Sequence, residues 1–274
     1  MNRKADLHIH TMYSDGSLSP SDVVRIASQR GICCISITDH DNVFGVDEAM
    51  SAGNAYHVEI IPGVEISAEE SGREMHILGY CMDYHDKDLI SFLKKIRQDR
   101  VERLRKMAGL LSERGMRIDV DDLLSSAGEV SISRLHIAMY MHKKGLVRDW
   151  RDAFRTYIGD NRSCYVANFS YTSKEVIDAI KAAGGIPVLA HPGINRLDTI
   201  LPRLVKEGIR GIEAFHSEHS GKAARGYESF ASCNGLIVTG GSDCHGGLKG
   251  EVIIGKSAIP YSYVGALKNA KSDR

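Results

Sequence analysis

Seven short apolar segments that alternate with helical patterns constrain the fold of this chain most strongly. The segments are residues 5–9, 32–38, 59–67, 75–81, 186–190, 209–215 and 236–239, with a weaker eighth at 252–259. Several are almost continuously apolar, which is typical of strands buried on both faces of a parallel sheet. Residues 20–30 and 173–183 are predicted to be helices, because each follows a capping Ser or Thr and stops at a glycine. This alternation predicts an α/β fold of repeated βα units.

The middle of the chain has a different pattern. From residue 88 to residue 166 the strand signal fades, and apolar residues such as Leu89, Leu93, Leu104 and Leu111 recur at helical spacing. We therefore expect a discontinuous barrel formed by residues 1–87 and 167–274, with residues 88–166 as a helical insertion that caps it. Acidic residues lie among the basic ones of this insertion, so its basic positions, Arg103 included, are expected to form a solvated helix face.

The composition is that of an ordinary globular protein. Charged residues make up 26% of the 274 residues, hydrophobic residues 43%, and the formal net charge is zero, so we expect no stable complex with long nucleic acid. The six cysteines form no C-x-x-C pair, and no apolar run approaches the roughly 20 residues that span a bilayer. These observations predict a cytoplasmic protein with reduced thiols and no membrane partner.

Ionisable side chains gather at the ends of the apolar segments, mostly where a segment stops. In a parallel barrel these ends face one mouth, where active sites are built. Burying so many ionisable groups without compensation would cost several kcal/mol each, so shared divalent ions are the economical explanation. The candidate metal ligands are His8, His10, Asp15, His40, Glu65, His76, His191, Asp243 and His245.

The types and number of these residues indicate which ions they would bind. Imidazole mixed with carboxylate suits Mn²⁺, Fe²⁺ or Zn²⁺. Nine ligands are more than one ion can use, so two or three divalent ions are expected, with Glu65 as a bridging carboxylate. Three such ions outweigh the three carboxylates, and the remaining positive charge suits a phosphate and would acidify a bridging water.

Six motifs together resemble the polymerase and histidinol phosphatase (PHP) family. They are ADLHIHTMYSDGS, ITDHD, PGVEIS, HILGY, LAHPG and GGSDCH, and they occur in the family's order over most of the chain. The resemblance implies a distorted seven-stranded (β/α) barrel with a trinuclear site, whose metal-bound hydroxide attacks phosphorus in line. One ion would take His8, His10, Glu65 and Asp243, a second Glu65, His76 and His191, and a third Asp15, His40 and His245.

The insertion resembles one branch of that family, which hydrolyses nucleoside 3′,5′-bisphosphates and trims short RNA from its 5′ end. By this resemblance Arg134 and His136 are candidate catalytic residues that clamp a phosphate. His216 is a candidate for contact with the substrate phosphate or leaving group, and His219 is a weaker candidate for substrate binding. An ordinary helix start would also explain Arg134 and His136, and structural support would explain the other two.

The sequence departs from the branch at three places. Leu135 replaces a proline, residues 160–162 replace a glycine-lysine-rich turn, and Cys244 replaces an aromatic residue between the last two ligands. The first two bear on substrate contacts, whereas Cys244 is expected to be a small packed residue. Three further acids, Asp6, Asp39 and Asp41, are expected to accept hydrogen bonds that orient the histidines.

The leading expectation is a phosphoric ester hydrolase that acts on a small nucleotide or the 5′ end of short RNA. A phosphatase of small non-nucleotide esters, such as histidinol phosphate, is the alternative enzyme, and a PHP scaffold domain is the non-enzymatic alternative. No base-stacking platform is evident, because each candidate ring is more typical of packing. These rings are Tyr140, Tyr165, Tyr171 and Phe215.

Overall fold

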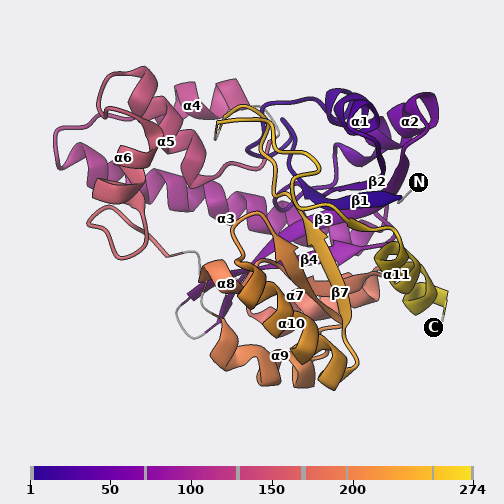
Figure 1. The fold of residues 1–274 in the computed structure, drawn as a ribbon. Helices are drawn as coiled ribbons and strands as arrows, with labels where there is room; N and C mark the ends of the chain where they lie inside the picture. The colour runs from indigo at the N-terminus through magenta and orange to yellow at the C-terminus, as the bar shows by residue number, and fades with distance from the viewer. Residues whose placement is uncertain are drawn as a thin grey trace.

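One mixed sheet forms the larger part of the molecule (Figure 1). The computed structural model describes residues 3–70, 73–127, 130–167, 171–195, 197–248 and 250–272. Its strands follow the order β7-β6-β5-β4-β3-β2-β1-β8. They are β1 (Lys4–Ile9), β2 (Ile32–Ile37), β3 (Glu59–Glu70), β4 (Arg73–Tyr80), β5 (Ile186–Leu189), β6 (Gly211–His216), β7 (Ile237–Gly241) and β8 (Ile259–Pro260).

The sheet closes almost completely into a barrel where the end of β1 meets the residues after β7. The amide of His10 donates to the carbonyl of Cys244, and the amide of Asp243 donates to the carbonyl of His8, both at 2.9 Å. A side chain at Gly241 would collide with the backbone of His8 at 2.4 Å, so this close approach requires glycine. The expected distorted α/β barrel is confirmed.

Among the strands from β1 to β7, β4 runs against both of its neighbours. Strands β1 to β3 are parallel, as are β5 to β7, but β4 pairs antiparallel with both β3 and β5. The start of β4 therefore lies beside the end of β3, with His76 opposite Ser67. This reversal explains why a candidate ligand that opens its strand reaches the same mouth as ligands that follow theirs.

The weak strand expected at residues 252–259 is mostly wrong. Only Ile259–Pro260 forms a strand, antiparallel to β1. The preceding residues are held by side chains instead, because Arg30 donates to the carbonyls of Val252 and Ile254, each at 2.8 Å, and Asp6 accepts from the amide of Gly255 at 2.7 Å. These bonds satisfy backbone groups that a strand would have paired.

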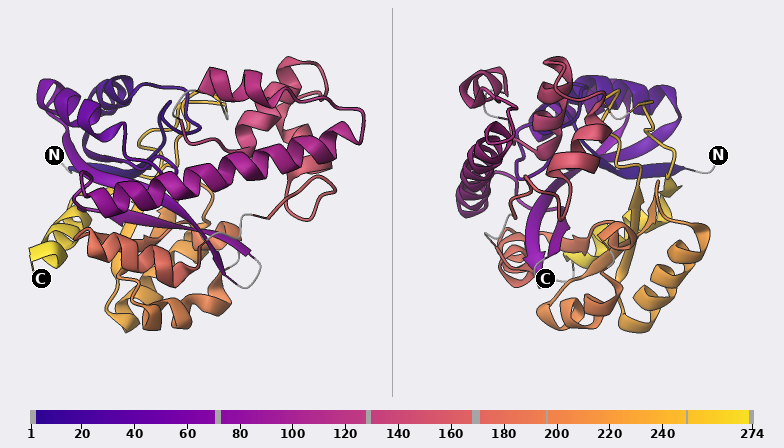
Figure 2. Two further views of the ribbon diagram at one scale, coloured as in Figure 1. Left: turned by 180° about the vertical axis from the view of Figure 1, so that it is seen from behind. Right: turned by 90° about the vertical axis from the view of Figure 1, so that its left-hand side faces the viewer.

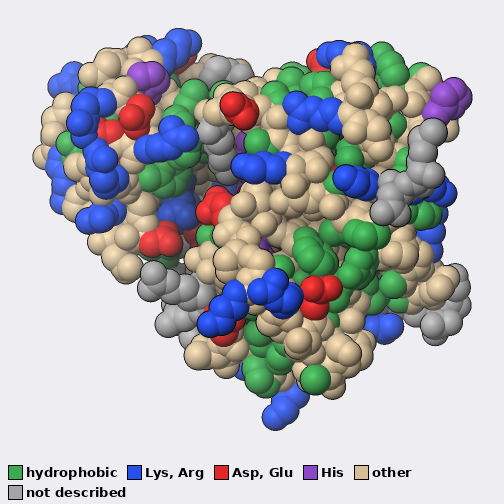
Figure 3. Space-filling model, in the orientation of Figure 1, with side chains coloured by type: hydrophobic (Ala, Val, Ile, Leu, Met, Phe, Trp, Pro, Cys, Tyr) green, Lys and Arg blue, Asp and Glu red, His purple; other side chains and the backbone are tan. Residues whose placement is uncertain are grey.

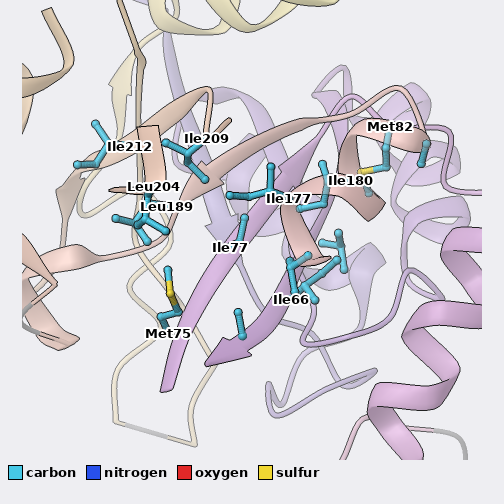
Figure 4. Packing of buried hydrophobic residues seen from close by; sticks show 14 of the residues in the cluster. Ile66, Met75, Ile77, Met82, Ile177, Ile180, Leu189, Leu204, Ile209 and Ile212 are labelled. Atoms are coloured by element: carbon cyan, nitrogen blue, oxygen red, sulfur yellow. The ribbon is translucent and has the colours of Figure 1, made fainter. Parts of the chain in front are cut away.

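Helices cover the outside of the barrel (Figures 1 and 2). Side-chain caps at Ser19 and Thr172 start the two helices predicted from sequence. Ile177 and Ile180 of one of them pack on Ile66 and Ile77 of the sheet (Figure 4). The helices are α1 (Pro20–Gln29), α2 (Val46–Tyr56), α7 (Ser173–Ala182), α8 (Pro192–Asn195), α9 (Leu201–Glu207), α10 (Gly221–Asn234) and α11 (Ser262–Ser272), with a 3₁₀ turn at Asp198–Ile200.

Helices between β4 and α7 pack around a second core beside the barrel. They are α3 (Lys87–Ser112), α4 (Val120–Ala127), α5 (Arg134–Lys143), α6 (Trp150–Ala153) and a π-helical turn at Phe154–Ile158. The long helix α3 joins the two bodies (Figure 2). Leu93 near its start belongs to the barrel core, whereas Leu111 near its end belongs to the second core. We propose that residues 88–166 act as one cap.

The basic residues of α3 do not form one solvated face. Lys94, Lys95 and Arg105 are exposed as expected, but Arg103 is only 7% exposed. It donates to the carbonyl of Val166 at 2.7 Å and to Glu74 at 3.0 Å. The sequence of α3 does not reveal that Arg103 points inward, because its partners Glu74 and Val166 lie outside the helix.

The shared helix α3 predicts that the two cores unfold together. Leu93→Ala and Leu111→Ala should each lower the free energy of unfolding by about 2–5 kcal/mol, because each removes a buried side chain. Trp150, the only tryptophan, lies against the second core, so its fluorescence reports that core while far-UV circular dichroism reports all helices. We expect both probes to give the same urea midpoint in each variant, with exposed Lys94→Ala as the control. A Trp150 transition that stays at the parental midpoint in Leu93→Ala would contradict this coupling.

Candidate metal centre

All nine candidate ligands meet in one cluster at the strand ends that form the barrel mouth. The surface of the molecule is hollowed between the barrel and the cap (Figure 3). They form four overlapping groups, and within each group the potential ligand atoms lie within 4.8 Å of one another. The groups are His10, Asp15, His40 and His245; His8, His10 and Asp243; His8, Glu65 and His191; and His40, Glu65 and His76. His10 and Glu65 each belong to more than one group, so ions bound here would share ligands.

Glu65 lies at the centre of the cluster and is 1% exposed. Its carboxylate oxygens lie 2.9–3.5 Å from the imidazole nitrogens of five histidines. These are His8, His10, His40, His76 and His191. A carboxylate with neighbours on all sides has the arrangement of a bridging ligand.

Several nitrogen and oxygen atoms of the cluster lie close together without forming hydrogen bonds to one another. Among the described residues, Asp15 Oδ1, His40 Nδ1, His191 Nδ1 and both ring nitrogens of His76 are buried without a well-aligned hydrogen bond. This holds even for His76 Nδ1, which lies 3.0 Å from Glu65. Buried polar atoms are rarely left this way, whereas lone pairs that converge on shared points fit metal ions. The residues present therefore fit a multinuclear metal site.

The carboxylates of the cluster are held in their ionised form. Burial alone would raise the pKa of Glu65, but His40, His76 and His8 lower that pKa well below its usual value. Burial would also raise the pKa of Asp243, but the nearby imidazoles of His245 and His8 outweigh this effect and lower that pKa. An ionised carboxylate is the form that binds a cation.

Glu213 supports the cluster and was missed in the sequence. It is fully buried in β6, accepts from His8 Nδ1 at 3.0 Å and accepts from the amide of His191 at 2.9 Å. The proton on His8 Nδ1 leaves Nε2 free to bind a metal ion. An acidic residue inside an otherwise apolar strand was the available signal, because such a charge must find a buried partner.

Two of the three acids expected to orient histidines, Asp6 and Asp39, bond the loops instead. Asp39 accepts from the amide of Thr11 at 2.7 Å and from Ser14 Oγ, which lies 3.4 Å from His10 Nδ1. Asp6 accepts from the amides of Ser242 and Gly255. Among the described contacts, neither acid bonds an imidazole directly. Their role is to fix the turns that carry the ligands.

Asp41 connects the metal centre to the cap. It accepts from the amide of Ser67 at 2.8 Å and from Arg100 Nε. The same guanidinium donates to Ser67 Oγ at 2.7 Å and to the carbonyl of Ile132 at 3.1 Å. Arg100 and Asp41 are buried, at 5% and 0% exposure. This ion pair therefore joins the loop after His40 to the segment that leads into α5.

Arg134 and His136 lie at the start of α5, facing the metal centre. Arg134 lies 3.5 Å from Glu74 and donates to Asp160 at 2.6 Å, and Glu74 is in turn 3.7 Å from His76. His136 Nδ1 accepts from the amide of Ser133 in a capping box, at 3.0 Å. Glu74 therefore links Arg134 to the candidate ligand His76, and His136 lines the same cavity as the candidate ligand Asp15. The sequence signal alone was consistent with a plain helix start.

His216 and His219 differ in their availability. His216 Nε2 lies 3.4 Å from Asp243, and its Nδ1 accepts from the amide of Glu218. His219 donates to the carbonyl of Ala214 at 2.9 Å and accepts from the amide of Gly193 at 3.2 Å. With both ring nitrogens engaged, His219 supports the loops around His216. Cys244 is buried and packs in the core, as expected.

Comparisons with known proteins agree with this geometry. A model of the PHP domain matches residues 6–157. A 3′,5′-nucleoside bisphosphate phosphatase from Chromobacterium violaceum is 33% identical over 246 residues, 88% of this chain and 86% of that protein. A 5′-3′ exoribonuclease from Haemophilus influenzae is 35% identical over 193 residues, 70% of each chain. The crystal structure of a candidate metal-dependent phosphoesterase from Bifidobacterium adolescentis superimposes with a TM-score of 0.89 at 29% identity, over 97% and 96% of the two chains.

The contacts of Glu213 predict that it controls metal affinity without binding metal. Glu213→Gln should weaken metal binding about 10–100-fold, because the amide no longer holds His8 and His191 as a carboxylate does. Metal content after dialysis against graded chelator, measured by elemental analysis, tests this expectation. Exposed Glu218→Gln removes the same charge nearby and serves as the control. Equal metal retention in both variants would exclude this role.

Proposed function

The chain belongs to the PHP-domain family of metal-dependent phosphoesterases, and on that premise we propose that it hydrolyses a small nucleotide or the 5′ end of a short RNA. It is a hydrolase of phosphate esters. One observation carries the choice of substrate: Arg134 and His136 of the cap lie beside the nine-residue centre. The names of the two relatives, a bisphosphate phosphatase and an exoribonuclease, support the same class.

The four ligand groups would hold two or three divalent ions, Mn²⁺, Fe²⁺ or Zn²⁺. When bound, such ions offset the charge of the phosphate and acidify a coordinated water. Glu65 would bridge them, because its carboxylate contacts histidines of several groups. Glu213 and Asp39 hold the ligands in place without joining them.

The cap residues would bind and orient the phosphate. The guanidinium of Arg134 presents paired donors that match phosphate oxygens. His136 Nδ1 accepts from a backbone amide, so a neutral ring carries its proton on Nε2 and can donate it to the phosphate. His216 has the same tautomer, since its Nδ1 accepts from the amide of Glu218, and its Nε2 beside Asp243 would donate to the substrate.

The alternative enzyme is a phosphatase of small non-nucleotide esters such as histidinol phosphate. The metal centre would serve either reaction, so the difference lies in the cap. No helix among the described residues is long and apolar enough to cross a membrane. A cytoplasmic location and the absence of a stable complex with long nucleic acid stay proposals based on composition.

A phosphate-release panel with added Mn²⁺ tests the proposed substrate class. It compares adenosine 3′,5′-bisphosphate, AMP, a 5′-phosphorylated trinucleotide and histidinol phosphate. We expect a nucleotide or the trinucleotide to give the highest kcat/KM, and Asp243→Ala or Glu65→Ala to abolish turnover and lower metal content. Preference for histidinol phosphate would refute the nucleotide proposal, and full activity of either variant would refute the role of the metal centre.

The clamp role of Arg134 predicts a binding defect with metal retained. Arg134→Ala should remove about 1.5–3 kcal/mol of charge-assisted hydrogen bonding, a tenfold to hundredfold rise in KM. Steady-state kinetics on the best substrate and metal analysis check both parts. Arg105→Ala, at an exposed position that pairs with Glu102, is the matched control. A KM equal to that of the control would remove Arg134 from the substrate site.

A further inference from the structure

Glu74 is a mostly buried carboxylate that lies between the metal centre and the cap. It is near the start of β4, two residues before the candidate ligand His76, and alternate residues of a strand face the same side. Its side chain is 14% exposed. The strand therefore carries an acid one step beyond a ligand, on the same face of the sheet.

The two ring nitrogens of His76 face two different carboxylates. Nδ1 lies 3.0 Å from Glu65, and Nε2 lies 3.7 Å from Glu74. The charge of Glu74 attracts a proton on Nε2, and this tautomer leaves the lone pair of Nδ1 for a metal ion at the centre. Glu74 therefore favours the form and the orientation of His76 that bind metal.

Arg103 of α3 fixes the position of Glu74. Its Nη2 donates to Glu74 Oε2 at 3.0 Å, and its Nη1 donates to Oε1 at 3.5 Å, so the two groups meet at two points. The same guanidinium donates through Nε to the carbonyl of Val166 at 2.7 Å. Arg103 is 7% exposed. Glu74 cannot turn away from the cap without leaving this buried charge without its partner.

The guanidinium of Arg134 lies between this buried carboxylate and an exposed one. Its Nη2 is 3.5 Å from Glu74, and its Nη1 donates to Asp160 at 2.6 Å. The side chain of Asp160 is 69% exposed, so this ion pair is open to water and salt. Glu74 attracts the guanidinium toward the metal centre, whereas Asp160 attracts it toward solvent. Without Glu74, the arginine would turn toward Asp160.

We propose, on the basis of the proposed function, that Glu74 is a positioning residue that orients both the metal ligand His76 and the phosphate clamp Arg134. Metal affinity and phosphate affinity then depend on one carboxylate. Charge repulsion alone predicts that removal of this anion strengthens phosphate binding. Positioning predicts the opposite sign, because an arginine that has turned away no longer meets the phosphate.

The first test measures metal affinity in the full chain, with elemental analysis after dialysis against graded chelator, and it needs no turnover. Glu74→Gln keeps the size of the side chain and removes its charge. It should lower metal affinity about 10–100-fold, the usual effect of changing a group that orients a ligating histidine. Glu102→Gln, at an exposed position of α3 that pairs with Arg105, should match the parent. Parental affinity in Glu74→Gln would overturn the positioning of His76.

The second test measures KM at saturating Mn²⁺, on the best ester of the phosphate-release panel. Glu74→Gln should raise KM about tenfold. Asp160→Asn removes the same charge from the solvent side of the guanidinium and should not raise KM. In an Arg134→Ala background, Glu74→Gln should raise KM no further, because its effect passes through that arginine. A lower KM in Glu74→Gln, or a further rise in the double variant, would overturn the positioning of Arg134.

Urea unfolding of the same variants separates positioning from a purely structural role. A lower midpoint in Glu74→Gln with parental metal affinity and KM would show that the carboxylate only stabilises the fold, and would overturn the proposal. No turnover of any ester by the metal-loaded parent would overturn the proposed function and the positioning of Arg134 with it. Metal affinity would in that case still decide the positioning of His76.

Discussion

The burial of one carboxylate, that of Glu65, is the constraint on which the rest of the structure depends. A buried ionised carboxylate loses its hydration, so the groups around it must supply hydrogen bonds or opposite charge in place of water. Here five imidazoles from four other segments supply it, so those segments must converge on the end of β3. The almost closed barrel, the reversed strand β4 and the tight approach at Gly241 all serve that convergence.

Most of the barrel and its cluster could be predicted, because both depend on local patterns. Buried strands show as apolar runs, and candidate ligands such as His40 and Asp243 lie just after them. Glu213 and Arg100 were not found, because their role depends on partners far away in sequence, His8 and Asp41. A single sequence shows a charged residue but not whether its partner is water or another charge.

The cap and the metal centre are coupled by buried polar contacts as well as by apolar packing. Arg100 bonds the loop after His40, strand β3 and the segment before α5 with one guanidinium. These contacts leave little room for movement, because the loss of a charged partner would leave a buried charge without compensation. The residues proposed to contact the phosphate and the candidate metal ligands are therefore positioned by the same interaction.

The reversed direction of β4 has a consequence for the position of the cap relative to the barrel mouth. The strand delivers the chain to the end of the barrel opposite the mouth, and α3 carries it back. With 26 residues, this helix is about 39 Å long, enough to pass the mouth and support the cap beyond it. The length of α3 therefore sets the distance between the barrel core and the core of the cap. A turn inserted into α3 after Arg100 would shift the cap by about 5 Å and break the bond from Arg100 to the carbonyl of Ile132, so the length of this helix and the position of the cap over the mouth must change together.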